Sequence, residues 1–211
     1  MPPAKKSPKA PIPDRIIDAM LSLAIEKGWT RTSLHEIAAE ADVSLAQLHE
    51  HYPSKPAILS ACMKRVDHQV LAGTGKPSKD ETTRDRLFDV LMRRFDAMKP
   101  YKDGIRGILR DIPRDPPVAL FLACRAKNSM RWMLEAAGVS CTGLFGKIQI
   151  KGAVAIYAAT MRVWLNDDSD DMGKTMAFLD KRLSRAEAVM DRACSFGPFG
   201  RRKSKTAEEP V

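Results

Sequence analysis

The chain has 211 residues, of which 44% are hydrophobic and 29% are charged, and its net charge is +9. This balance is typical of a globular protein and excludes a fully disordered chain, and no apolar stretch reaches the roughly 20 residues of a membrane-spanning helix. Aromatic residues make up only 6% and β-branched clusters are sparse, so the composition predicts an all-α fold.

The N-terminal residues are poor in large apolar side chains. Residues 1–13 carry Lys5, Lys6 and Lys9 and little apolar content beyond Ile12. This composition predicts a flexible basic arm, which either tracks DNA or is a solvated tail. A helix is expected from residue 14 to Gly28, because apolar residues then recur at helical spacing. These residues are Ile17, Met20, Leu21 and Ala24.

Two capping boxes follow in close succession. Ser33 with Glu36, and Ser44 with Gln47, each have the spacing at which a hydroxyl and a longer side chain cap the same helix N-terminus. The sequence therefore predicts two short helices, the second ending near His51. They are separated by a break at residues 42–43.

The spacing of these two helices fits a helix-turn-helix motif. Ala38 is a small residue at the position where the two helices would touch, and Asp42 lies in the turn, where the backbone is left-handed. Apolar residues flank both positions, namely Ile37, Ala41, Val43 and Leu48. In this motif the second helix enters the major groove of DNA.

The remainder of the chain is predicted to be helical. Residues 52–55 form a turn after which Ser54 caps a helix that reaches Val66, and residues 73–80 are the clearest linker. Further helices are expected at 87–98, 105–112, 116–137, 144–165 and 170–194. Ser169 is the expected N-cap of the last helix, with Asp170 and Asp171 in its first turn. Residues 196–211 are expected to be a disordered basic tail.

The stretch from 14 to 59 resembles the TetR family of regulators. The resemblance rests on Gly28-Trp29, Thr32-Ser33-Leu34, Glu36-Ile37-Ala38, Ala41-Asp42-Val43-Ser44, Leu48, Tyr52-Pro53-Ser54-Lys55 and Ala57-Ile58-Leu59. It implies a three-helix DNA-binding domain over 14–60 and a larger helical domain over 61–195 that dimerises and binds a small molecule. The implied protein is a cytoplasmic, ligand-responsive repressor that binds a double-stranded DNA operator.

The sequence also departs from this family. Asp42 replaces the usual glycine, Leu45-Ala46 replace the usual pair after the serine, and His49-Glu50-His51 replace the usual aromatic pattern. Residues 14–60 carry four basic and seven acidic side chains. The resulting net charge of −3 is poor for binding phosphates.

We expect the helix at 44–51 to supply the DNA-reading surface. Ser44, Gln47 and His49 are the foremost candidates for base or phosphate contacts, followed by His51, and Leu45 and Ala46 complete the predicted surface. Ser33, Tyr52 and Lys55 are expected to contact the phosphate backbone, where contacts position the protein without reading sequence.

A second resemblance covers about residues 83–185. Tyr157, Thr160, Trp164-Leu165, Asp167, Ser169, Thr175, Phe178-Leu179 and Arg182 resemble the C-terminal region of the lipid-binding accessory protein of ubiquinone biosynthesis. This resemblance implies an alternative, a lipid-binding protein of the isoprenoid quinone pathway on the same fold, or a regulator with a pocket of that type.

The second domain is also expected to hold an apolar or lipid-like ligand and to form a homodimer. The candidate pocket residues are Phe95, Met98, Phe121, Cys124, Trp132, Tyr157, Met161 and Trp164. The two C-terminal helices are expected to pair with those of a second copy. The apolar residues assigned to this pairing are Ile148, Val154, Ile156, Met161 and Trp164 on one helix and Met172, Met176, Leu179, Leu183 and Met190 on the other.

We expect no enzyme activity, metal site or cofactor. Phosphate-loop, dinucleotide and nucleophile-elbow motifs are absent from the sequence, and its four histidines lack the spacing of a metal site. Cys62, Cys124, Cys141 and Cys194 are scattered, which fits reduced thiols in the cytoplasm, and the first fifteen residues lack the apolar core of a secretory signal. The acidic residues at 167–171 are better explained by a helix cap than by a cation. The glycine pairs at 104/107 and 143/146 carry no functional signal.

Overall fold

The computed structural model describes residues 10–75 and 81–196. Within these ranges the chain is helical and contains no strand. The helices are α1 (Ile12–Glu26), α2 (Leu34–Glu40), α3 (Leu45–His51), α4 (Lys55–Ala72), α5 (Thr83–Met98), α6 (Lys102–Asp111), α7 (Pro116–Ala136), α8 (Gly143–Leu165) and α9 (Gly173–Phe196), with 3₁₀ turns at Lys99–Tyr101 and Ile112–Arg114. The all-α prediction is confirmed, and none of the described helices is long and apolar enough to cross a membrane.

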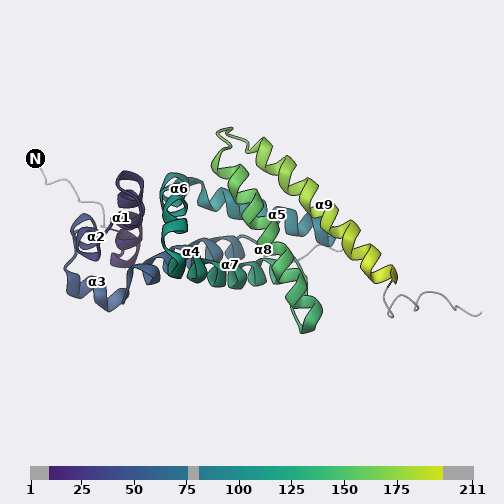
Figure 1. Cartoon of the computed structure of the whole chain (residues 1–211), viewed down its shortest axis with the longest axis horizontal. Coiled ribbons are helices and arrows are strands. Elements are labelled where there is room, and N and C mark those ends of the chain that lie inside the picture. Colours follow the sequence, from purple (N-terminus) through teal and green to yellow (C-terminus); the bar gives the residue numbers. More distant parts are fainter. Residues whose placement is uncertain (1–9, 76–80, 197–211) are drawn as a thin grey trace, which may run out of the picture.

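The molecule is elongated, with α1–α3 at one end and α8 and α9 toward the other (Figure 1). The helix α1 begins at Ile12 with Pro11 as its N-cap, so helical structure starts inside the segment predicted to be an arm. Residues 1–9 and 197–211, where the rest of the arm and the tail were predicted, lie outside the described residues.

Both predicted capping boxes are present. The Ser33 hydroxyl accepts from the Glu36 N–H at 3.2 Å, and Glu36 accepts from the Ser33 N–H at 2.8 Å. The Ser44 hydroxyl accepts from the Gln47 N–H at 3.1 Å, and Gln47 Oε1 accepts from the Ser44 N–H at 2.9 Å. These reciprocal bonds satisfy N–H groups that a helix N-terminus otherwise leaves without partners.

The helix α4 joins two hydrophobic cores. Its first half packs Ile58 and Leu59 into the core of α1–α3, whereas Val66 and Val70 belong to the core formed with α5, α7, α8 and α9. The predicted boundary between residues 60 and 61 therefore falls within a continuous helix, so the first domain is attached to the second by a rigid element.

The helix α6 packs closely against α1 through two glycines. A Cβ on Gly107 would collide with the backbone oxygen of Ala24, and a Cβ on Gly104 would lie 2.9 Å from a methyl of Leu21. The glycine pair at 104/107, which carried no functional signal in the sequence, thus allows a close contact between α6 and α1. Its spacing of three residues places both glycines on one face of the helix.

We expect Gly107→Ala to lower the free energy of unfolding by about 1–3 kcal/mol, since the added methyl must push α6 away from the α1 backbone. Urea denaturation followed by circular dichroism measures this change. Gly152→Ala is the matched control, because a Cβ there meets nothing within 4 Å. It should stabilise the protein by about 0.5–1 kcal/mol through helix propensity. Equal effects of the two substitutions would contradict the proposed packing.

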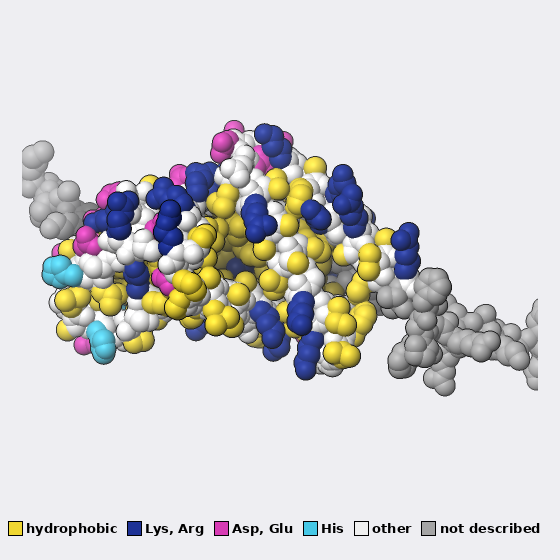
Figure 2. Space-filling model, viewed as in Figure 1, with side chains coloured by type: hydrophobic (Ala, Val, Ile, Leu, Met, Phe, Trp, Pro, Cys, Tyr) yellow, Lys and Arg dark blue, Asp and Glu magenta, His cyan; other side chains and the backbone are white. Residues whose placement is uncertain are grey.

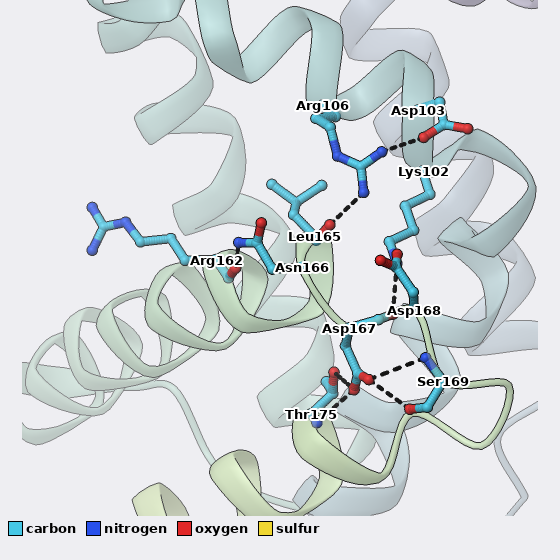
Figure 3. Close-up of polar contacts among 10 residues, drawn as sticks. All are labelled: Lys102, Asp103, Arg106, Arg162, Leu165, Asn166, Asp167, Asp168, Ser169 and Thr175. Atoms are coloured by element: carbon cyan, nitrogen blue, oxygen red, sulfur yellow. Dashed lines mark hydrogen bonds and ion pairs between the residues drawn. The ribbon is translucent and has the colours of Figure 1, made fainter.

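The connection between α8 and α9 differs from the prediction. The helix α9 begins at Gly173, and the preceding Met172 has a left-handed backbone with φ 53°, so Ser169 is not its N-cap and Asp170 and Asp171 are not in its first turn. Asp167 takes the capping role from outside the helix (Figure 3). Its carboxylate accepts from the N–H and hydroxyl of Thr175, at 2.9 and 2.7 Å, and from the Ser169 hydroxyl.

The start of α6 binds this same connection (Figure 3). Lys102 donates to the backbone oxygen of Asp167 at 2.6 Å, and Arg106 donates to the backbone oxygen of Leu165. These carbonyls lie at the C-terminus of α8, where cationic donors are favoured. The helix α6 therefore contacts α1 along one face and the α8–α9 connection at its beginning.

Candidate DNA-binding surface and ligand-binding groove

The helix α3 presents its outer face to solvent and its inner face to the first core. Leu48 is buried, whereas Leu45, Ala46, His49 and His51 are exposed. The turn before the helix contains Asp42 with φ 53°, which is the left-handed backbone expected there. Histidine side chains lie at the surface over this end of the molecule (Figure 2).

The capping boxes limit what two predicted base-reading residues can do. Gln47 Oε1 is bonded to the Ser44 N–H, and the Ser44 hydroxyl accepts from the Gln47 N–H. A two-point contact of Gln47 with adenine would require its oxygen to leave the cap. The exposed side chains of α3 outside the capping box are Leu45, Ala46, His49, Glu50 and His51, and all of these except Glu50 belong to the predicted surface.

Two of the predicted backbone contacts are engaged inside the protein. The Lys55 ammonium donates to the backbone oxygens of Trp29 and Thr32, at 2.7 and 2.9 Å, and lies 4.4 Å from the centre of the Trp29 ring. Burial lowers its pKa. Tyr52 is half-buried, and its hydroxyl donates to the backbone oxygen of Pro13 at 3.4 Å. Lys55 thus fixes the chain between α1 and α2, a role that the sequence did not indicate.

The two domains are also linked by a carboxylate. Asp111, at the end of α6, accepts from the Thr30 N–H and the Thr30 hydroxyl, each at 3.1 Å. Asp111 is buried, and the Thr30 N–H holds its pKa below the ordinary value. Sequence reasoning missed this link because the two residues are 81 positions apart.

The first capping box makes the stability of α2 depend on pH. Hydrogen bonds from Lys27 and from the Ser33 N–H lower the pKa of Glu36 from 4.5 to about 2. Because the folded value lies below the unfolded one, this contribution to stability is present above about pH 4.5 and is lost as the pH falls toward 2.

We expect Glu36→Gln to weaken this pH dependence. Glutamine can close a capping box, as Gln47 does at the start of α3, but its side chain carries no charge. Urea denaturation of the two proteins between about pH 6 and 2.5 tests it. The difference in stability between wild type and variant should shrink as the pH falls. Parallel stability curves would show that the ion pair with Lys27 contributes nothing.

The predicted ligand-pocket residues lie partly in the core and partly at the surface. Phe95, Tyr157 and Trp164 are buried and pack on one another, with ring centres 5.5 and 5.7 Å apart. Met98 is also buried there and accepts a hydrogen bond from the Tyr157 hydroxyl. Of the other four residues, Met161 packs against this same core. Phe121 and Met161 are half-buried, whereas Cys124 and Trp132 are exposed.

A different part of the second domain forms an apolar groove of about 620 Å³. Its walls come from α8 and α9, and its floor comes from α5 and the end of α7. The lining residues are Thr83, Arg84, Leu87, Leu134, Val139, Ile148, Gln149, Gly152, Ala153, Ala155, Ile156, Arg182, Leu183, Arg185, Ala186, Glu187, Val189 and Met190. None of the eight predicted pocket residues is among them, so this groove lies apart from the predicted pocket, which stays a prediction.

The predicted dimer residues divide between core and surface. Trp164, Met172, Leu179 and Leu183 are buried within the same chain, whereas Ile148 is 55% exposed. Helical spacing could not separate these groups, because both helices have apolar residues on more than one face. Further apolar residues exposed on α8 and α9 are Leu144, Phe145 and Val189.

The acidic residues between α8 and α9 take part in the cap of α9. Within the described residues, no group of histidine, cysteine, aspartate or glutamate side chains has the geometry of a metal site. The hydrogen bonds of Asp167 explain the acidic run as a helix cap, with the capping residue two positions earlier than predicted.

Comparison with known proteins supports both resemblances. Residues 16–62 match the family model described as bacterial regulatory proteins, tetR family, and residues 152–190 match the model described as COQ9. The HTH-type transcriptional activator FasR of Mycolicibacterium smegmatis is 25% identical over 158 residues, which cover 73% of this chain and 72% of that protein. The HTH-type transcriptional regulator YerO of Bacillus subtilis is 28% identical over 109 residues, 46% of this chain and 35% of that protein.

Solved structures share the fold. A TetR transcriptional regulator from Nitrosomonas europaea superimposes with a TM-score of 0.67 at 23% identity, covering 84% of this chain and 99% of the other. Salmonella enterica GusR gives a TM-score of 0.59 at 17% identity, covering 89% of this chain and 99% of the other. At these identities the likeness concerns the arrangement of helices.

Proposed function

We propose that this chain, whose residues 16–62 carry the sequence pattern of the TetR-family DNA-binding domain, is a transcriptional regulator that responds to a small molecule. The observation that carries the proposal is the α2–turn–α3 unit, which has both caps, a left-handed turn at Asp42 and an exposed outer face on α3. Regulation in general, and not repression in particular, is proposed, because the relative from Mycolicibacterium smegmatis is named an activator.

DNA reading in this proposal uses the exposed face of α3. His49 and His51 offer ring N–H groups and acceptors to base edges or phosphates, and Leu45 offers an apolar surface for a thymine methyl. The helix carries no lysine or arginine, so sequence-independent attraction must come from outside it. Lys5, Lys6 and Lys9 are the candidates in the N-terminal segment.

A homodimer would place two α3 helices on successive turns of one face of DNA, about 34 Å apart. The exposed apolar side chains of α8 and α9 support pairing of these helices across a two-fold axis. Such a dimer binds a palindromic operator, and changes in the separation of its two α3 helices alter affinity for DNA.

The helix α6 provides a physical connection between the two ends of the molecule. Lys102 and Arg106 donate hydrogen bonds to the α8–α9 connection. Gly107 packs against α1, and Asp111 accepts a hydrogen bond from Thr30. A ligand that shifts α8 or α9 would therefore move α6 and, through it, the DNA-binding domain. The close packing of Gly107 on the backbone of α1 would pass such a shift of α6 on to α1.

The proposal is tested by selecting binders for the full chain from a random double-stranded DNA pool. We expect a palindromic consensus with two half-sites. The double variant Leu45→Ala/His49→Ala keeps both caps and should lower affinity for the consensus about tenfold or more, while affinity for random DNA changes little. The control is His35→Ala, a substitution of an exposed histidine on α2. Failure to recover any consensus would overturn the proposal.

A second candidate function rests on the match of residues 152–190 to the COQ9 model. Eleven of the groove-lining residues fall in this segment, from Gly152 to Met190. A lipid-binding accessory protein on this fold would use the groove and would not need α3. Lipid extraction of the purified chain followed by mass spectrometry, together with a failed DNA selection, would favour this candidate.

A further inference from the structure

The outer face of α7 carries large apolar side chains that no other described segment covers. Leu120 is 68% exposed and Trp132 is 52% exposed. Cys124 is also exposed, and Phe121 is half-buried. The other two tryptophans of the chain are buried. Large apolar side chains that gather at the surface of one helix are typical of an interaction surface.

The same face of α7 is positively charged. Arg125, Lys127 and Arg131 follow one another along the helix, whose only acidic residue is Glu135. None of the three cations forms an ion pair or a side-chain hydrogen bond with another described residue. The Arg125 Nε is buried and has no hydrogen-bond partner among the described residues. A buried N–H without an acceptor is unfavourable, so a carboxylate from outside the chain would improve this site.

Contacts within the chain place these side chains beside α4. The Ser129 hydroxyl donates to the Asp67 carboxylate, so these two residues face one another between α7 and α4. The two helices run in the same direction, because both begin in the first hydrophobic core and continue into the second. Arg125 lies four residues before Ser129 and Trp132 lies three residues after it. Both are therefore on the side of α7 that adjoins α4.

The adjoining side of α4 carries the same two kinds of side chain. Lys64 lies three residues before Asp67 and is exposed, and Leu71 lies four residues after it and is half-buried. Lys64 is thus level with Arg125, and Leu71 is level with Trp132. The cationic and the apolar positions are two helical turns apart, which is about 10 Å. We call this surface the α4–α7 face, and its members are Lys64, Leu71, Phe121, Arg125, Arg131 and Trp132.

The proposed homodimer leaves the α4–α7 face uncovered. Leu134 contributes to the floor of the groove between α8 and α9. Trp132 lies two residues earlier, about 200° around the axis of α7, and therefore points away from that groove. In Figure 1, α7 runs along the lower side of the molecule, and Figure 2 shows hydrophobic and basic side chains there. A partner can bind this face while α8 and α9 pair with those of a second copy.

We propose that the α4–α7 face is a docking surface for an acidic amphipathic helix of another protein. Tryptophan and arginine contribute most to binding at protein–protein interfaces, and both are present on this face. Apolar side chains of the partner helix pack on Trp132 and Leu71. Carboxylates two turns away pair with Arg125 and Lys64 and accept charge-assisted hydrogen bonds.

Charge complementarity selects this partner. A second copy bound through the same face would bring cations close to cations, which oppose one another. DNA binding needs a continuous row of cations, whereas Phe121 and Trp132 interrupt the row on this face. An acidic helix with apolar residues matches both kinds of position. The inference does not rest on the proposed function, because it uses neither α3 nor a small-molecule ligand.

The test is selection of binders for the full chain from a displayed library of random peptides. We expect the recovered peptides to share leucine or aromatic residues at helical spacing, with aspartate or glutamate about two turns away. A synthetic peptide with the recovered consensus should shift the tryptophan emission of the chain to shorter wavelength. Trp132 reports this shift because the other two tryptophans are buried. Calorimetric titration of the peptide gives its affinity.

The apolar part of the face is tested by Trp132→Ala, which should weaken the peptide about tenfold or more. The matched control is Ile25→Ala, which removes an exposed apolar side chain from α1. This control should change the affinity less than about twofold, since scattered surface residues contribute little to binding. Equal losses from the two variants would overturn the assignment of the apolar anchor.

The charged part of the face has its own matched pair. Arg125→Gln/Arg131→Gln should weaken the peptide about tenfold or more, and the loss should shrink at high salt. Arg162→Gln/Arg192→Gln removes the same charge from exposed positions on α8 and α9. This control should alter the affinity less than about twofold, because the charges lie outside the face.

Other outcomes decide against this partner. Recovery of basic peptides, or of none, would overturn the proposal. Attachment to phosphatidylglycerol vesicles that Trp132→Ala abolishes, without peptide binding, would overturn it in favour of a membrane surface. A change of oligomeric state in Trp132→Ala would assign the face to contacts between copies and overturn it as well. The peptide selection contains no DNA, so its failure and the failure of the operator selection are distinguishable.

Discussion

Replacing Arg94 with methionine should lower the free energy of unfolding by about 3–5 kcal/mol. Arg94 is 1% exposed and pairs with Asp67, which is also buried. The Asp67 carboxylate also accepts from the Ser129 hydroxyl, and Arg94 donates to the Tyr157 hydroxyl at 3.2 Å. Removing the cation leaves a buried carboxylate without its counter-charge, and the loss of the partner is the costly step.

The control for this prediction is the double variant Arg94→Met/Asp67→Leu. Apolar residues of similar volume replace both charges, so the double variant should be more stable than Arg94→Met alone. Urea denaturation at neutral pH gives all the required free energies. A double variant less stable than the single one would show that the network of α4, α5, α7 and α8 depends on its polar groups beyond the ion pair.

Replacing Leu179 with aspartate should unfold the second domain or destabilise it by about 4 kcal/mol or more. Sequence spacing assigned Leu179 to a dimer interface, where this substitution would separate two folded protomers. The structure buries Leu179 completely inside the chain. The substitution removes a core side chain and adds a carboxylate without a partner.

The matched control is Ala177→Asp, two residues earlier on the exposed face of α9. This variant should keep its helical circular dichroism, and light scattering then reports whether this face takes part in the proposed dimer. Leu179→Asp should instead lose cooperative unfolding. A folded, monomeric Leu179→Asp protein would restore the interface assignment and contradict the observed packing.

Arg94 and Leu179 hold different helices of the second core in place. The Arg94–Asp67 pair holds α5 against α4, and α4 continues from the second core into the first. Leu179 holds α9 against the same core. The α1–α3 unit is thus carried by α4 and contacted by α6, and both helices also contact the part of the chain that contains the groove.

The sequence by itself determined the local features of this protein. The helix starts at Leu34, Leu45 and Lys55 follow from the serines that precede them, because a capping hydroxyl bonds an N–H only three residues away. The same locality explains why the left-handed turn at Asp42 was predicted. The TetR resemblance depends on this run of short-range signals and is confirmed by the match over residues 16–62.

The tertiary structure alone decided which partners distant residues meet. Sequence context assigned Lys55 to the DNA backbone and Leu179 to a dimer interface. In the structure Lys55 bonds carbonyls of the segment between α1 and α2, and Leu179 lies in the core. Asp167 caps α9 from across a loop, and the groove lies away from the aromatic residues that suggested a pocket. The physical reason is that a helix with apolar residues on several faces does not specify which face its neighbours will cover. That choice is made by the packing of all the helices together.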